Sequence, residues 1–249
     1  MTTSLPVSAV LAWWGTAWLR GDVVPDLVLD AVIGEDATHA VAGLPGEDGT
    51  VTLLAALAAL RIDGANGFGC AAPAPGDPVG LGGPAAFNAA ALEAGEAVVV
   101  SGSGLGLVPS RVGAAVVWEA MPAQPRPLPD VGEADRDLRS ALLDAANRLA
   151  ALDVAHWRPE VADELMNLRH PHPVTAPPGI PGRCLDLAGR GLQAMTIVDL
   201  ALADDGGALS AHEIGQRRDA LAGLGRAGRR ALVAACSPEA WPPPDSGSQ

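Results

Sequence analysis

The sequence predicts an α/β (or α+β) fold: a small mixed sheet with helices, preceded by two helices and followed by a three- to four-helix bundle. Three observations support this prediction. Short apolar runs alternate with helical patterns between residues 36 and 122, a proline-rich segment follows at residues 121–130, and only helical periodicity comes after it.

Two helices are predicted before the sheet. In residues 7–19, apolar side chains recur at spacings of 3, 4 and 7, which places one apolar stripe on a helix. Trp14 and Trp18 lie on this stripe and Trp13 lies beside it, so the helix carries more apolar surface than one buried stripe requires. A second helix is predicted at residues 25–33, with Pro25 in its first turn.

Strands are predicted where short apolar runs occur, at residues 39–44, 67–72, 97–100 and 114–118. Helical patterns at residues 50–62 and 84–93 lie between them. The first run, the helix after it and the second run together suggest a βαβ unit.

A domain boundary is predicted at MPAQPRPLPD, residues 121–130, because its four prolines disfavour both helix and sheet. Helical patterns follow at residues 133–153, 159–168, 183–203 and 210–235. We therefore expect N-terminal helices plus an α/β domain at 1–122, a helical domain at 131–241 and a disordered tail at 242–249.

Composition excludes several classes of protein. With 49% hydrophobic and 18% charged residues the chain is globular, and its net charge of -13 opposes nucleic-acid binding. The 3 cysteines form no paired pattern, which favours reduced thiols and a cytoplasmic location. The apolar stretch at residues 5–19 lacks a basic leader and is too short to span a membrane, so we expect a soluble, acidic protein without a membrane partner.

Two glycine-rich loops and one histidine pair are the places to look for a ligand site. SGSGLG at residues 101–106 follows a strand but lacks the helix that a phosphate loop requires, so a turn between strands is favoured. The loop at residues 76–84 is predicted to be a mobile connection, which is flexible enough to approach a ligand closely. His170 and His172, with Cys184, lack a recognisable ligand spacing, so no metal and no cofactor are predicted.

Asp199 is the candidate catalytic residue. On the helix predicted at residues 183–203 it projects with Leu192 and Met195, where a carboxylate must be paired or protonated. Two interpretations stay open: an ion pair with an arginine such as Arg148, or a cleft acid with a raised pKa.

Four arginines on the last predicted helix are the candidate binding residues. Arg218, Arg226, Arg229 and Arg230 lie away from its apolar face. They could bind an anionic partner, or the acidic first half of the same chain.

Five segments carry a family resemblance: GDPVGLGGPAAFNAAALEAGEAVVV, DVGEADRDLRSALL, WRPEVAD, LALADDGGALSAHEIGQRR and ALVAACSPEAW. They resemble an uncharacterised family of actinobacterial proteins, and the resemblance spans nearly the whole chain. It implies a cytoplasmic location. The family has no assigned activity, so the resemblance implies no catalytic residue.

The sequence contains no recognisable reactive constellation, which favours a non-catalytic cytoplasmic binding or regulatory protein with a protein partner or a second copy of itself. Two alternatives remain open. One is a small-molecule enzyme with Asp199 in a cleft between the two domains and the loops at 76–84 and 101–106 holding substrate. The other is a self-assembling structural protein that associates through the helix of Trp13, Trp14 and Trp18.

Overall fold

The computed structural model describes residues 4–151, 174–203 and 211–241, which form two compact units. The α/β unit comprises Pro6–Pro129, Ala176–Pro181 and the segment from Cys236. The helical unit comprises the described residues of Met1–Leu5, Asp130–Thr175 and Gly182–Ala235. The helix predicted at residues 159–168 and the tail at 242–249 lie outside the described residues.

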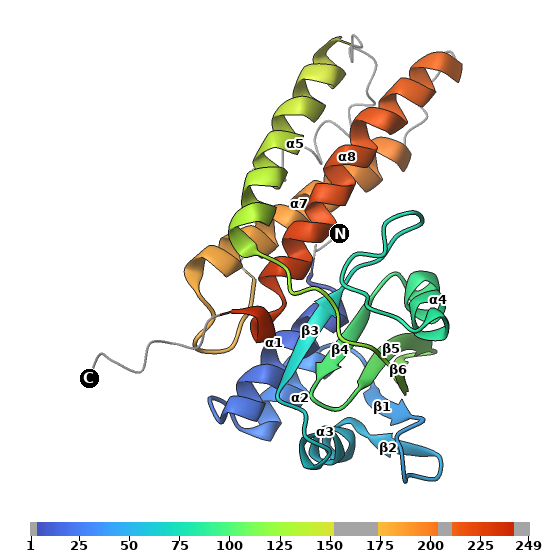
Figure 1. Ribbon diagram of the computed structural model, residues 1–249, viewed down its shortest axis with the longest axis vertical. Coiled ribbons are helices and arrows are strands. Elements are labelled where there is room, and N and C mark those ends of the chain that lie inside the picture. The colour runs from blue at the N-terminus through green and yellow to red at the C-terminus, as the bar shows by residue number, and fades with distance from the viewer. Residues whose placement is uncertain (1–3, 152–173, 204–210, 242–249) are drawn as a thin grey trace, which may run out of the picture. The chain divides into compact units, whose positions relative to one another are not determined.

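The α/β unit contains a six-stranded mixed sheet in the order β2-β1-β6-β5-β4-β3 (Figure 1). Its strands are β1 (Thr38–Ala42), β2 (Thr50–Thr52), β3 (Gly67–Ala71), β4 (Ala97–Ser101), β5 (Leu105–Val112) and β6 (Ala115–Pro122). Only β1 and β6 pair in parallel, and the other four neighbouring pairs are antiparallel. The predicted mixed sheet is confirmed. The predicted βαβ unit is wrong, because β1 and β3 are not neighbours.

Helices account for most of the remaining described structure (Figure 1). The α/β unit holds α1 (Val7–Arg20), α2 (Pro25–Ile33), α3 (Leu53–Ile62), α4 (Ala85–Ala94) and the short 3-10 helix η1 (Pro238–Ala240), and the helical unit holds α5 (Val131–Ala151), α7 (Gly182–Ala203) and α8 (Ala211–Ala235). The two predicted N-terminal helices are confirmed. No helix among the described residues is long and apolar enough to cross a membrane.

Helix α1 is buried on nearly all sides. Trp13 is 0% exposed, and Trp14 and Trp18 are each 8% exposed. Gly15 allows α1 to lie against the sheet, since a Cβ at this position would come within 2.8 Å of the ring of Phe68 on β3. All three indoles are therefore buried within the chain, and α1 does not present them as an exposed surface for the self-assembly that the sequence suggested.

The outer edge of β3 is closed by side chains and by the C-terminal segment. Thr16 Oγ1 accepts a hydrogen bond from the Phe68 amide at 2.9 Å and donates one to the Phe68 carbonyl at 3.3 Å. The Cys70 amide donates to the Cys236 carbonyl at 3.1 Å, and Arg126 Nη1 donates to the Cys70 carbonyl at 2.6 Å. An edge strand with satisfied backbone groups cannot accept an added strand, so this edge is protected from association.

A buried ion pair joins two distant parts of the chain. Arg126 Nη2 lies 2.5 Å from Glu239 Oε1, and the two side chains are only 3% and 6% exposed. The same nitrogen donates to Ser237 Oγ at 2.7 Å. Gly69 on β3 leaves the space for this pair, because a Cβ there would collide with both Arg126 and Glu239. Residues 236–241, predicted to belong with the helices, are thus held on the sheet.

Replacing Arg126 by Met should unfold the protein at a clearly lower urea concentration. The change leaves the Glu239 carboxylate buried without its cation, which costs about 3 to 5 kcal/mol of unfolding free energy. Tryptophan fluorescence during urea unfolding measures this loss. Arg111→Met is the matched control, because Arg111 also pairs with a carboxylate but is 68% exposed. If the two variants lose equal stability, the buried pair does not hold the C-terminal segment as described.

The helical unit depends on a close contact between α7 and α8. A Cβ at Gly191 of α7 would lie 2.9 Å from the Gly228 carbonyl oxygen and 3.0 Å from the Leu232 amide nitrogen, both on α8. A Cβ at Gly228 would in turn lie 3.0 Å from the Gly191 carbonyl oxygen. The two backbones touch here because neither helix carries a side chain at the crossing.

Gly191→Ala should destabilise the helical unit, because a methyl group that meets backbone atoms forces the helices apart, at about 1 to 3 kcal/mol. Gly189→Ala on the same helix is the control. A Cβ at Gly189 meets nothing within 4 Å, and alanine should stabilise the helix there by about 0.5 to 1 kcal/mol. Circular dichroism at 222 nm measures the unfolding temperature of both variants. If the two substitutions shift this temperature equally and in the same direction, the close crossing of α7 and α8 is ruled out.

Candidate binding groove of the helical unit

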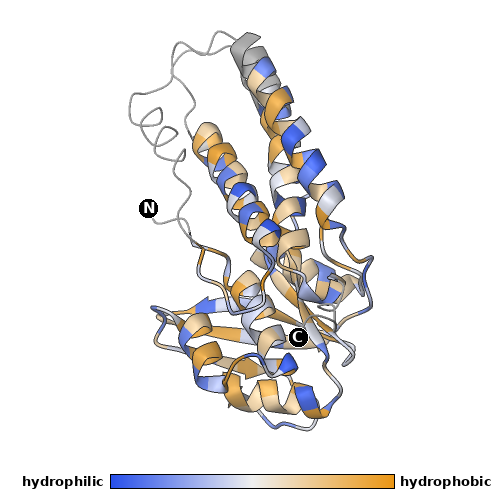
Figure 2. Cartoon of the chain, turned by 90° about the vertical axis from the view of Figure 1, so that its left-hand side faces the viewer, coloured by the Kyte–Doolittle hydropathy of each residue, from blue (hydrophilic) through white to orange (hydrophobic). Residues whose placement is uncertain are grey.

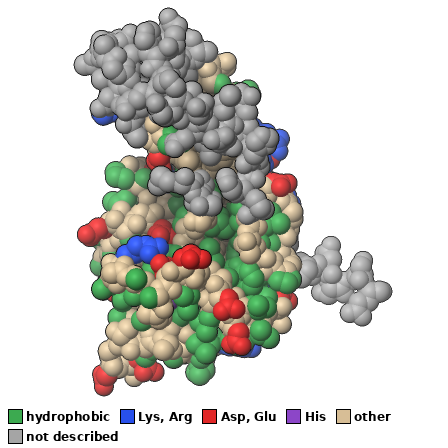
Figure 3. Space-filling view, turned by 180° about the vertical axis from the view of Figure 1, so that it is seen from behind, with side chains coloured by type: hydrophobic (Ala, Val, Ile, Leu, Met, Phe, Trp, Pro, Cys, Tyr) green, Lys and Arg blue, Asp and Glu red, His purple; other side chains and the backbone are tan. Residues whose placement is uncertain are grey.

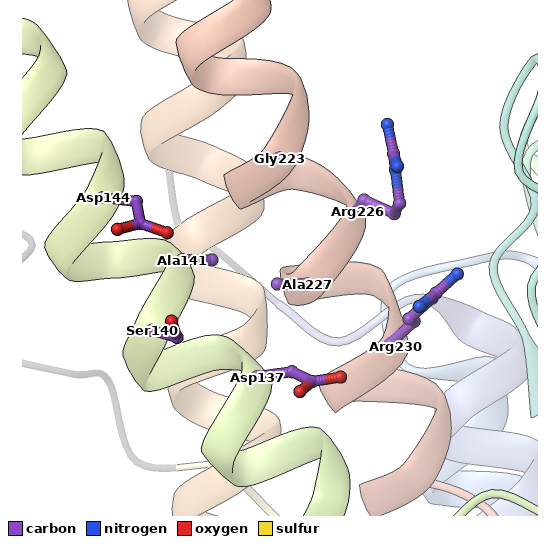
Figure 4. A pocket seen from close by; sticks show the side chains of 8 residues that line it. All are labelled: Asp137, Ser140, Ala141, Asp144, Gly223, Arg226, Ala227 and Arg230. Atoms are coloured by element: carbon purple, nitrogen blue, oxygen red, sulfur yellow. The ribbon is translucent and has the colours of Figure 1, made fainter.

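A groove of about 250 Å³ runs between α5 and α8 in the helical unit (Figure 4). Its lining residues are Asp137, Ser140, Ala141, Asp144, Gly223, Arg226, Ala227 and Arg230. All eight belong to the helical unit, so the groove is complete within it. Figure 2 shows hydrophilic and hydrophobic residues interspersed along the long helices of this unit.

The two walls of the groove carry opposite charges. On α5, Asp137, Ser140 and Asp144 are spaced by 3 and 4 residues, which puts them on one side of the helix. On α8, Arg226 and Arg230 are 4 residues apart and share a side in the same way. We call the two aspartates the acidic wall and the two arginines the basic wall.

Small residues form the floor between the walls. Ala141, Gly223 and Ala227 line it, and Ala227 is 7% exposed. A Cβ at Gly223 would meet nothing within 4 Å, so the groove is open at this point. Six of the eight lining residues are exposed. The groove is therefore a shallow surface feature that can receive a side chain or a helix face, and it does not enclose a small molecule.

The four candidate arginines of α8 do not act as one cluster. Arg226 and Arg230 line the groove, and Arg218 is exposed but does not line it. Arg229 is half-buried and lies close to Asp199 of α7, whose pKa its charge lowers. Neighbouring positions on a helix are about 100° apart, so Arg229 and Arg230 necessarily point in different directions.

Asp199 is exposed on α7 and does not line the groove. Partial burial raises the pKa of its carboxyl, and the positive charge of Arg229 opposes this rise. The sequence places Asp199 with Leu192 and Met195 on α7, and in the structure its side chain is exposed. Its nearby cation is Arg229, whereas the side chain of the expected partner, Arg148, lies outside the described residues.

In the sequence, the acidic residues of the groove can be recognised only as part of the polar face of a helix. The apolar stripe of their helix leaves Asp137 and Asp144 on the opposite side, without a role. Their spacing of 7 residues with Ser140 between them is the signal that could have identified one wall. That α8 would supply the other wall depends on the packing of helices far apart in sequence.

Asp135 ties the helices of this unit together. Its Oδ1 lies 2.5 Å from Arg190 Nη2 of α7, and its Oδ2 pairs with Arg139 one turn further along α5. Partial burial tends to raise the pKa of the Asp135 carboxyl, but the hydrogen bond and charge of Arg190, with the charge of Arg139, outweigh it and lower the pKa. Asp135 is therefore a structural residue between α5 and α7.

A second polar cluster, in the α/β unit, has both nitrogens of a buried histidine engaged. Trp118 Nε1 donates to His39 Nδ1 at 3.3 Å, which makes His39 Nε2 the protonated nitrogen, and this donates to Asp36 Oδ2 at 3.1 Å. Hydrogen bonds from Arg111 and His39 lower the pKa of the Asp36 carboxyl. His39 has no nitrogen left for a metal or for proton transfer, so this cluster fixes β1 on β6.

The glycine-rich loops serve the fold. Residues 102–104 make a tight turn between β4 and β5, as predicted. The loop at residues 76–84 is held in place, because Arg126 Nη1 donates to the Gly80 carbonyl at 3.0 Å and the Gln124 amide donates to the Gly83 carbonyl at 2.8 Å.

Metal and thiol chemistry find no support in the part of the chain that the structure describes. No cluster of three or more histidine, cysteine or acidic residues there could hold a metal ion. His170 and His172 lie outside the described residues. All three cysteines are buried, and burial raises the pKa of the Cys70 thiol to about 12. The thiol of Cys70 is therefore protonated and unreactive.

Two protein-family models match the chain. The model "Rv1486c-like protein, N-terminal domain" matches residues 8–131 and the model "Rv1486c-like protein, C-terminal domain" matches residues 132–233, so the two meet at the start of α5. No solved structure matches the chain.

The chain is similar to three uncharacterised mycobacterial proteins. It is 33% identical to Rv1486c of Mycobacterium tuberculosis strain H37Rv, with 94% of this chain and 98% of the relative covered. The values are the same for MT1533 of Mycobacterium tuberculosis strain CDC 1551. MAV321 of Mycobacterium avium is 32% identical, with 72% of this chain and 74% of the relative covered.

The ion pairs of Asp135 should make the helical unit sensitive to acid. Because the folded-state pKa of Asp135 lies below its ordinary value of 3.8, its ionised form stabilises the protein above that pH, and this contribution disappears as pH falls through the folded-state pKa. Asp135→Asn should therefore lower the free energy of unfolding at pH 7, and the gap to the wild type should narrow below pH 3.8. Urea unfolding of the wild type and the variant at pH 7 and below pH 3.8 measures the difference in unfolding free energy. A difference that does not change with pH would contradict the assignment of these ion pairs to Asp135.

Proposed function

We propose that this chain, which belongs to the Rv1486c-like family of uncharacterised mycobacterial proteins, is a non-catalytic binding or regulatory protein. Its helical unit binds a protein partner in the groove between α5 and α8. The observation that carries this proposal is the pair of opposite walls: an acidic wall and a basic wall face one shallow, small-residue floor.

The charged side chains of the groove support a binding role. Within the described part of the chain, no hydrogen bond or ion pair engages Asp137, Asp144 or Arg226. Asp135, one turn from the groove, is by contrast held by two arginines. Exposed charges with no partner gain most when a surface of complementary charge desolvates them, and such complementarity selects the partner and its orientation.

The shape of the groove favours a macromolecule over a small molecule. Small-molecule sites bury most of their ligand in a cleft of roughly 300 to 1,000 Å³. This groove has a volume of about 250 Å³ and exposes most of its lining residues. The enzyme alternative gains no support, since its candidate acid, Asp199, is exposed and outside the groove.

A cytoplasmic location fits the thiols. Cys70, Cys184 and Cys236 are buried and form no disulfide with one another, as in proteins that remain in a reducing compartment. Acidic side chains occupy more places than basic ones on the face seen in Figure 3, in keeping with the net charge of -13 and with a partner other than nucleic acid.

The test compares the full chain with a groove variant and a charge-matched control. Asp144→Arg reverses the acidic wall, and Glu93→Arg makes the same charge change at an exposed position of α4. After affinity purification from actinobacterial cells, quantitative mass spectrometry should show at least one protein, the chain itself included, depleted about tenfold or more by Asp144→Arg and retained by Glu93→Arg. Identical protein profiles for all three chains would overturn the proposal.

A further inference from the structure

We propose that the occupant of the groove is the same groove of a second copy of this chain, so that α5 and α8 of two copies form a symmetric four-helix interface. This inference rests on the proposed function and names the partner. Its basis is that the groove is complementary to itself: it presents an acidic wall on α5 and a basic wall on α8.

The order of residues along α5 and α8 determines where each charged side chain lies along the length of the groove. In Figure 4, Asp137 lies beside the end of the groove that holds Arg230, and Asp144 lies beside the end that holds Gly223. This order reverses along α8, as it must for helices that run in opposite directions. With a rise of about 1.5 Å per residue, Arg226 lies at about the level of Ala141, within about one turn of Asp144.

Only one orientation of the two-fold axis brings opposite charges together. A two-fold axis parallel to the helices places α5 of one copy over α8 of the other and keeps every residue at its own level. The acidic wall then faces the basic wall twice, with Asp144 near Arg226 of the partner subunit. A two-fold axis in the plane of the interface but across the helices would place acidic wall on acidic wall, and this is repulsive.

The floor permits the approach that this interface requires. Ala141, Gly223 and Ala227 carry at most one carbon atom in their side chains, so a facing helix can lie close. Three of the charged side chains at the walls, Asp137, Asp144 and Arg226, are exposed and available. Since each copy carries a net charge of -13, two randomly chosen faces repel, and matched walls supply the attraction that selects this face.

The experiment uses two single charge reversals of the full chain, Asp144→Arg and Arg226→Asp. Light scattering after size exclusion should give a dimer for the wild type. Each variant alone should dissociate at least about tenfold more readily, because both of its contacts become repulsive. Mixed in equal amounts, the two variants should form a heterodimer as tight as the wild type, because the guanidinium introduced by Asp144→Arg then faces the carboxylate introduced by Arg226→Asp. An ion pair within one chain cannot produce this rescue.

The controls and the contrary results of this experiment also test the dimer. Glu93→Arg should stay dimeric, and thermal unfolding should show that the groove variants, whose changes are at exposed positions, remain folded. A wild type that stays monomeric at several hundred micromolar, or a mixture no more associated than its components, overturns the dimer. In that event, depletion of another protein by Asp144→Arg still supports the groove as a binding site, whereas unchanged protein profiles overturn the proposed function as well.

Discussion

The structure depends on the buried ion pair between Arg126 and Glu239. Removing two charges from water is costly, and the cost is met only where geometry and extra hydrogen bonds are good. Here the guanidinium also binds Ser237 and the carbonyls of Cys70 and Gly80, so most of its donors are used. The pair in turn requires Gly69, since any side chain at that position of β3 would occupy its space.

This pair also joins the two segments that flank the helices of the helical unit in the sequence. Arg126 lies in the connector before α5, and Ser237 and Glu239 follow directly after α8. One guanidinium thus holds together the segment that leads into the first helix of the groove and the segment that leads out of the last. The same contacts close the edge of β3, so a single arginine serves the sheet and the C-terminal segment.

Several polar side chains of the described residues are engaged within the fold or face solvent. His39 uses both ring nitrogens within the fold, Cys70 is buried as a neutral thiol, and Asp199 faces solvent. Asp137, Asp144 and Arg226 carry exposed charges and line the groove between α5 and α8. The proposed partner, a second copy of the chain, would bring charges of opposite sign against these side chains.

The local structure could be predicted from the sequence: the bounds of α1 and α2, the short buried strands, the proline-rich connector and the long amphipathic helices. These follow from periodicity, proline and glycine, which act between neighbours in the chain. Other features emerged only in the folded chain: the strand order, the burial of all three indoles of α1, the exposure of Asp199, and the separation of Arg226 and Arg230 from Arg229. The pairing of Arg126 with Glu239 is another. These features depend on contacts between residues far apart in the sequence, 113 positions for Arg126 and Glu239, and a local pattern specifies which face of a helix is apolar but not which distant surface will cover it.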